Sequence, residues 1–144
     1  MWSIALPGFA QLLTGNLIKG LLFVVLEFLV NVYSHFNKGI MLSFLGETEK
    51  ALQVIDVQWL MFYPCLYMFA MWDAYRSVMP EDEKLTFLPF VFSAYFVTVG
   101  LMVSPKVKIL GVFPGPVFLP MLFVIPGVIS GFLIRKVLMK FYAS

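Results

Sequence analysis

Two stretches of this chain, residues 85–104 and 117–134, contain no charged side chain. Each is about as long as the ~20 apolar residues that a helix needs to cross the ~30 Å hydrocarbon core of a bilayer. Two further apolar stretches, residues 17–36 and 54–75, are of similar length and carry few ionisable groups. A helix suits a lipid environment because it satisfies its backbone polar groups internally. The pattern therefore predicts an all-α protein that crosses the membrane several times.

The composition agrees with lipid as the main solvent. Of the 144 residues, 61% are hydrophobic and 12% are charged, and the mean hydropathy is +0.93. These values lie outside the usual range of soluble globular domains, and too little polar sequence is left for a separate extramembrane domain. We therefore expect one integral membrane domain over residues 1–144, with the lipid bilayer as its first partner.

Charge and cysteine content argue against several other classes. The net charge of +2 is small and the basic residues are scattered, so we expect no nucleic-acid partner and no polybasic lipid patch. Cys65 is the single cysteine, which excludes an intrachain disulfide, and its apolar surroundings indicate a packing role. The chain start has no basic leader and no obvious cleavage site, so we expect no removed signal peptide.

The apolar stretches predict a transmembrane helical bundle with about four full spans. The expected spans are residues 17–36, 54–75, 85–104 and 117–134. Pro64 is expected to bend the second span, and Trp59 and Trp72 are expected to anchor its two ends in the membrane interfaces.

Two shorter segments do not fit a full crossing. Residues 1–13 are interrupted by Pro7 and Gly8, which predicts an N-terminal half-helix or re-entrant segment. Residues 40–55 carry apolar side chains at near-helical spacing with charged residues between them, which predicts an interfacial amphipathic helix. Residues 105–116 are rich in Pro and Gly and are expected to form an irregular link.

The basic residues predict an orientation if all four spans cross. Six of them fall on one side: Lys19, Arg76, Lys84, Arg135, Lys136 and Lys140. Four fall on the other side: Lys38, Lys50, Lys106 and Lys108. Because cytoplasmic loops carry the excess of Lys and Arg, this division predicts a multi-pass cell-membrane protein with both termini in the cytoplasm. A crossing by residues 1–13 would move the N-terminus to the outside.

Glu27 is the residue that most needs an explanation at membrane depth. An ionised carboxyl group there costs about 2.5 to 3.5 kcal/mol on insertion scales. Glu27, Asn31 and His35 follow one another at intervals of four, which predicts a polar stripe that faces protein or water. The preferred interpretation is a protonated Glu27 hydrogen-bonded with Asn31, while His35 meets headgroups. A proton or cation relay, and a ligand or partner contact, are the alternatives.

Two further sets of residues predict contacts between helices. Lys19 begins the first span and Asp73 closes the second, so we expect these two residues to form an interfacial ion pair. Arg76 lies nearby and competes with Lys19 for the Asp73 carboxylate. Separate solvation of these side chains is the alternative. Gly127 and Gly131 form a small-xxx-small face that lets another backbone approach closely. The sequence leaves open whether that backbone belongs to this chain or to a second subunit.

The start of the chain carries a motif. Residues 6–20 read LPGFAQLLTGNLIKG, which resembles the PGxGQxYxGxxxKG head of small bacterial integral membrane proteins and, more loosely, the TM2-domain-like proteins. A Trp-Asp pair late in a later span is frequent in them, and Trp72-Asp73 looks like it. Ala10 and Leu13 stand where glycine and an aromatic residue are usual. The resemblance implies a bacterial plasma-membrane protein of a largely uncharacterised group, and no established catalytic residues.

No pattern in the chain predicts catalysis. The single histidine, the single cysteine and the dispersed acids provide neither metal-ligand spacing nor a nucleophile beside a base. We therefore expect no enzyme activity, no metal and no cofactor, and we expect Asp56 to cap or solvate the second span. The leading hypothesis is an accessory or interaction protein that packs against itself or a larger membrane complex. The alternative is a small proton- or cation-coupled transporter or channel subunit that uses Glu27.

Overall fold

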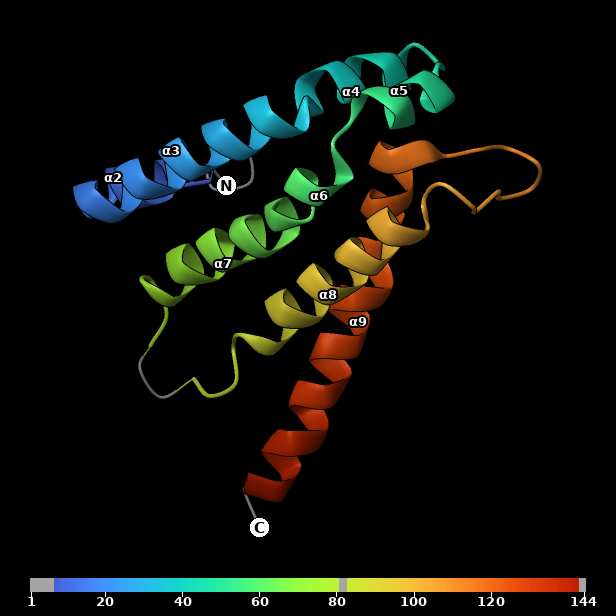
Figure 1. The fold of residues 1–144 in the computed structure, drawn as a ribbon. Coiled ribbons are helices and arrows are strands. Elements are labelled where there is room, and N and C mark those ends of the chain that lie inside the picture. Colours follow the sequence, from blue (N-terminus) through green and yellow to red (C-terminus); the bar gives the residue numbers. More distant parts are fainter. Residues whose placement is uncertain (1–6, 81–82, 143–144) are drawn as a thin grey trace.

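A computed structural model describes residues 7–80 and 83–142 of the chain (Figure 1). Within these residues the regular structure is helical, apart from an isolated bridge between Ile109 and Val112. The helices are α2 (Phe9–Leu13), α3 (Leu17–Ser34), α4 (Phe36–Phe44), α5 (Thr48–Val54), α6 (Val57–Leu60), α7 (Phe62–Arg76), α8 (Leu88–Val103) and α9 (Gly115–Tyr142). The predicted all-α fold is confirmed for the described residues.

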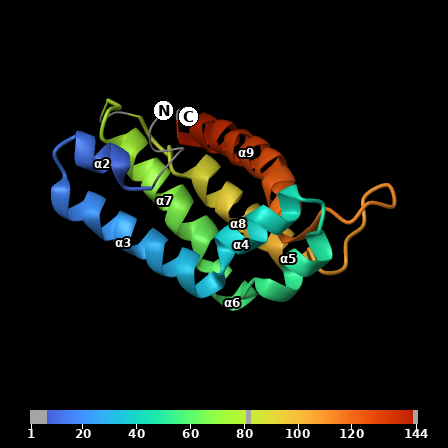
Figure 2. The same ribbon diagram turned by 90° about the horizontal axis from the view of Figure 1, so that it is seen from above.

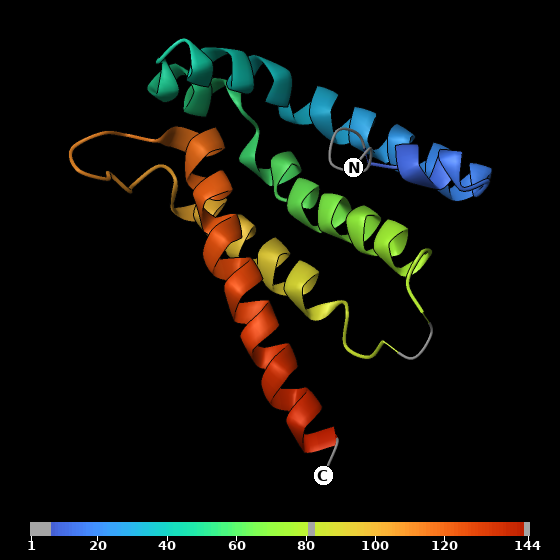
Figure 3. The ribbon, with the colours of Figure 1, turned by 180° about the vertical axis from the view of Figure 1, so that it is seen from behind.

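Four helices, α3, α7, α8 and α9, form the body of the molecule. Each runs antiparallel to the preceding one, and contacts join α3 to α7, α7 to α8, and α8 to α9 (Figures 1 and 2). The four helices therefore form an open row in which the two middle helices separate α3 from α9. The short helices α4 and α5 gather at the end of the row where α3 ends and α9 begins (Figure 3).

Two of these helices are long and apolar enough to cross a membrane, namely α3 and residues Gly115–Phe141 of α9. In their most apolar windows only 22% and 28% of the residues are buried, so apolar side chains cover most of their outer surface. Such a surface is suited to lipid. A third span results if α5 is counted together with α6 and α7, a pair bent by 91°. Helix α8 is apolar but shorter, with 16 residues.

The helices end near the predicted limits for identifiable local reasons. Helix α3 ends at Ser34 because His35 has a left-handed backbone conformation with a φ of 55°. The second predicted span is interrupted at Met61, between α6 and α7. This break precedes Pro64, whose ring has no N–H for the Leu60 carbonyl and crowds it. Helix α9 extends beyond the predicted fourth span at both ends.

The amphipathic helix predicted over residues 40–55 is split into α4 and α5. The turn between them contains Gly46, which has a φ of 81°. The Gly46 N–H donates to the Ser43 carbonyl and the Glu47 N–H donates to the Leu42 carbonyl, which are the paired bonds of a Schellman motif. Because a residue with a Cβ is strained at positive φ, this glycine ends α4 where hydrophobic spacing alone would have continued it.

A compact core lies at the end of the row where α5, α6, α8 and α9 meet. Its buried members are Ile55, Leu60, Leu101 and Val117. The Thr48 hydroxyl donates to the carbonyl of Phe113 at 3.0 Å and ties α5 to the segment that leads into α9. This core packs the helices together at that end of the row.

The most extensive helix contact joins α8 to α9 and depends on glycines of α9. A Cβ at Gly127 would lie 2.7 Å from the Cα of Ser93, and a Cβ at Gly131 would collide with the Cα of Pro89. The two backbones are therefore in direct contact, as small-xxx-small faces allow. The backbone that Gly127 and Gly131 accommodate belongs to α8 of the same chain.

The variant Gly131→Ala tests this contact. Its methyl group would meet the backbone of Leu88 and Pro89, so we expect the free energy of unfolding in detergent to fall by about 1 to 3 kcal/mol. Unfolding of the purified protein by heat or by SDS measures the change. Ser130→Ala, at the neighbouring position, serves as the control and should change the stability by less than about 0.5 kcal/mol. Equal effects of the two variants would contradict the contact.

Candidate functional site

The motif at the chain start folds α2 back onto the beginning of α3. Gly8 has a φ of 92°, and a Cβ there would lie 2.5 Å from the Gly20 carbonyl oxygen. A Cβ at Gly20 would in turn lie 2.6 Å from the Leu12 side chain. Gly15 has a φ of 83° and ends α2, with the Asn16 N–H donating to the Gln11 carbonyl. The three glycines of the motif thus permit one turn, one helix stop and one close approach.

The polar residues of the same motif meet the end of α7. Gln11 is 1% exposed, and its Nε2 donates to the Ala70 carbonyl at 2.8 Å and to Asp73 Oδ2 at 3.2 Å. Lys19 Nζ lies 3.1 Å from Asp73 Oδ1. We call Gln11, Lys19 and Asp73 the polar clamp, because one carboxylate accepts from two segments of the head. The clamp joins the two parts of the chain that carry the family resemblance.

Sequence reasoning expected Lys19 beside Asp73 but missed Gln11. The available signal was that Gln11 is the one polar side chain within residues 6–13. Its Oε1 is buried and accepts no hydrogen bond from the residues that the structure describes. The Arg76 guanidinium, also expected near the carboxylate, donates from Nη1 to the Pro80 carbonyl at 3.0 Å. The polar clamp thus attaches α2 and the start of α3 to the end of α7.

Glu27 lies on the face of α3 that packs on α7. Phe23, Val30 and Ser34 are buried on the same face, and the ring of Phe23 meets that of Phe69 with centroids 5.8 Å apart. The Tyr63 hydroxyl donates to Glu27 Oε1 at 3.5 Å. Glu27 thus lies on the buried face of α3, and Tyr63 of α7 is its hydrogen-bond partner.

The other two members of the predicted polar stripe have surroundings different from those of Glu27. Asn31 pairs with Asn37: its Nδ2 donates to Asn37 Oδ1 at 3.3 Å, and its Oδ1 accepts from the Asn37 N–H at 3.3 Å. His35 is exposed and outside the helix. Glu27 and Asn31 lie one turn apart on α3 but bond to different residues, Tyr63 and Asn37. His35 lies beyond the end of α3, where its left-handed backbone conformation ends the helix.

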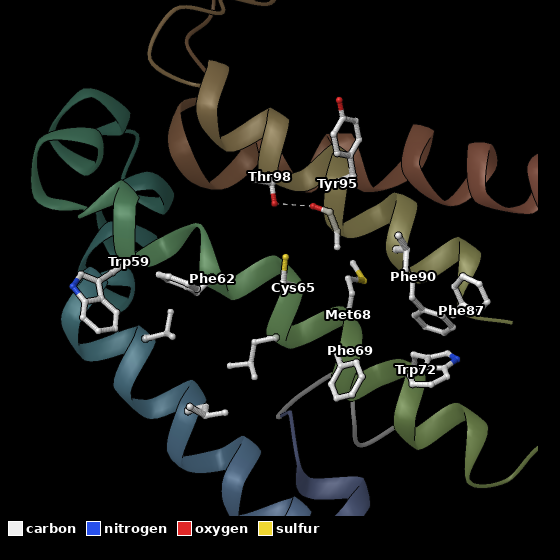
Figure 4. A pocket seen from close by; sticks show the side chains of 15 residues that line it. Trp59, Phe62, Cys65, Met68, Phe69, Trp72, Phe87, Phe90, Tyr95 and Thr98 are labelled. Carbon is white, nitrogen blue, oxygen red and sulfur yellow. Dashed lines mark hydrogen bonds between the residues drawn. The ribbon is translucent and has the colours of Figure 1, made fainter. Parts of the chain in front are cut away.

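An apolar groove of about 1120 Å³ runs between α3, α7 and α8 (Figure 4). Helix α7 forms its floor with Phe62, Cys65, Leu66, Met68, Phe69 and Trp72. Most of these positions recur at intervals of three or four, which places them along one face of the helix. The groove therefore follows the axis of α7, with α3 and α8 as its two walls.

The groove offers almost no polar group to an occupant. The Thr98 hydroxyl is already bonded to the Ala94 carbonyl at 2.8 Å (Figure 4). Trp72 Nε1 donates to Thr86 Oγ1 at 3.4 Å. The remaining lining is aliphatic, aromatic and the thiol of Cys65, which is exposed there. An apolar surface of this kind suits a helix or a lipid chain and offers a polar substrate few hydrogen bonds.

The structure also bears on the predicted cap at Asp56 and on metal binding. Asp56 precedes α6, and its Oδ1 accepts from the Trp59 N–H at 3.2 Å, so the predicted helix cap is present. Trp59 itself stacks on Tyr33, with centroids 4.8 Å apart. In the part of the chain that the structure describes, no three His, Cys, Asp or Glu side chains form a group that could hold a metal ion.

Comparison with known proteins assigns no family. No protein-family model matches the chain, and no curated protein or solved structure matches it. The resemblance of the head to small bacterial membrane proteins therefore rests on its own residues, and a functional proposal has to rest on the geometry described above.

Substitutions in the polar clamp should differ in cost. Asp73→Ala removes the acceptor of both Gln11 and Lys19, so we expect it to lower the free energy of unfolding by about 1 to 3 kcal/mol. Lys19→Ala removes one ion pair of a largely exposed side chain and should cost at most about 1 kcal/mol. Unfolding midpoints in detergent measure both. A larger effect of Lys19→Ala would contradict the central role of the carboxylate.

Proposed function

We propose that this chain is a four-span protein of the bacterial plasma membrane that acts as an accessory component of a membrane complex. The observation that carries the proposal is the apolar groove, which the open row of helices leaves along α7. In this proposal the groove seats one transmembrane helix of a partner protein. The partner completes the bundle that α3, α7, α8 and α9 leave open.

The lengths and directions of the helices support four spans. Residues Val57–Arg76 would extend about 30 Å at 1.5 Å per residue, which matches the hydrocarbon thickness. Helix α8 would extend about 24 Å, and a short span of this kind is accommodated by local thinning of the bilayer. Its antiparallel packing on the long apolar α9 also favours a crossing.

The charged side chains support an orientation with both termini in the cytoplasm. The end of the row that holds the polar clamp also holds Arg135, which pairs with Glu83 at 3.1 Å and donates to the Lys84 carbonyl. This end collects the larger share of the basic residues, and the positive-inside rule assigns it to the cytoplasm.

Labelling on either side of α8 tests the four-span topology. Val78 and Leu110 are 70% and 99% exposed and flank α8 in the chain. In a Cys65→Ser background, a membrane-impermeant maleimide should label Leu110→Cys in intact cells, and Val78→Cys only after lysis. Labelling of both positions in intact cells, or of neither, would contradict a crossing by α8.

The shape of the groove favours a helix as its occupant. Its floor on α7 and its wall on α8 each expose a stripe at helical spacing, the pattern by which one helix packs on others. Ala94 and Cys65 are small and lie along these stripes, so a partner backbone can approach closely there. The groove is open along its side, which allows a helix to enter from the plane of the membrane.

The glycine face of α9 is not the docking surface in this proposal. A second copy that bound at Gly127 and Gly131 would have to displace α8, whose backbone touches both residues. A homo-oligomer formed through the groove would leave the α8–α9 contact intact. A second copy of the chain is therefore one outcome of the experiment that follows.

Photocrosslinking within native membranes tests the groove. A benzophenone amino acid in place of Phe69, on the groove floor, should give a defined adduct with one membrane protein. Val91→Trp narrows the groove from an exposed position on its α8 wall and should reduce this adduct to background without lowering the amount of protein.

The matched control is the same benzophenone residue in place of Phe28. Phe28 is 67% exposed on α3 against 52% for Phe69, so exposure alone would favour the control. Adducts with lipid alone from Phe69, or protein adducts of equal yield from both positions, would contradict a helix seat.

A further inference from the structure

A second cavity, of about 350 Å³, lies on the side of α7 that faces α4 and α9. Four aromatic side chains contribute to its wall: Phe36 and Phe44 from α4, and Tyr63 and Tyr67 from α7. The ring centroids are 5.1 Å apart for Phe36 and Tyr63, and 5.9 Å apart for Tyr63 and Tyr67. One side of the cavity is thus a continuous run of aromatic rings.

The carboxyl group of Glu27 lies next to this aromatic wall. Its Oε1 accepts the hydrogen bond from the hydroxyl of Tyr63, so a single tyrosine ring separates the carboxyl group from the cavity. None of the ion pairs among the described residues includes Glu27. A carboxylate within an apolar span is costly unless a cation compensates it. The aromatic rings and the acid therefore form a site that favours positive charge.

We propose that this cavity binds a small organic ammonium cation with apolar substituents. Cations are attracted to the face of an aromatic ring within about 6 Å of its centroid. In this proposal Glu27 is ionised when the cation is bound, unlike the protonated form preferred from the sequence alone. Its negative charge then acts on the same cation, more strongly in an apolar surrounding than in water. The hydrogen bond from Tyr63 to Glu27 polarises the phenol and strengthens the attraction of its ring.

The remaining walls explain why the cation should be organic. Leu101, Val117 and Pro120 line the rest of the cavity and would contact apolar substituents. A metal ion would need several oxygen, nitrogen or sulfur ligands, and the described residues provide no such group. The volume lies at the small end of the range of about 300 to 1,000 Å³ that is usual for ligand pockets. The site shares the lining residue Met68 with the groove but lies on another side of α7, and the proposal does not depend on a partner helix.

Binding of a matched pair of probes tests the proposal on the wild-type chain in lipid nanodiscs. Benzyltrimethylammonium carries the cation, and neopentylbenzene has the same shape with carbon in place of the charged nitrogen. After subtraction of partition into empty nanodiscs, equilibrium dialysis should show at least about tenfold tighter binding of the cation, which corresponds to about 1.4 kcal/mol. Equal binding of the two probes would overturn the proposal.

Two variants then locate the site. Glu27→Gln keeps the shape of the side chain and should weaken binding of the cation about tenfold or more, whereas Glu49→Gln, at an exposed position on α5, should not change it. Tyr67→Leu keeps Glu27 and removes one ring, and it should weaken binding of the cation but not of the neutral probe. Unchanged cation binding in both Glu27→Gln and Tyr67→Leu, with normal elution on size exclusion, would also overturn the proposal.

Discussion

The direct backbone contact between α8 and α9 is the interaction on which the arrangement of the helices depends. Because Gly127 and Gly131 bring the two backbones together, α8 has its opposite side free for α7, and α7 in turn supports α3. The result is a row with two broad apolar faces. In lipid such faces carry little penalty, since acyl chains are as apolar as the side chains they cover. In the membrane setting that we propose, the bilayer would therefore contribute to the stability of this arrangement.

The head of the chain shows how a short motif can combine two requirements. Its glycines allow the backbone to turn and to lie against α3, and its two polar side chains both reach Asp73. Gln11 and Lys19 lie on different segments, so their common carboxylate closes the loop between α2 and α3 onto α7. This geometry brings Asp73, late in α7, next to a head that is far away in the sequence.

The sequence predicted the features that depend on local polarity and length. The extent of α3, the cap at Asp56 and the proximity of Lys19 to Asp73 all follow from hydrophobic runs and from the helix ends they imply. It did not predict the pairing of Asn31 with Asn37, because this contact depends on the change of chain direction at the left-handed residue His35. The groove could not be predicted either, since it arises from the order of whole helices in space.

The position of Cys65 has a practical consequence for the protein in its natural form. This thiol is the single one in the chain, and it is exposed on the floor of the groove. Its rate of alkylation by an apolar reagent reports directly on whether the groove is covered. The wild-type molecule thus carries its own chemical sensor of occupancy, at the place where an engineered label would otherwise have to be introduced.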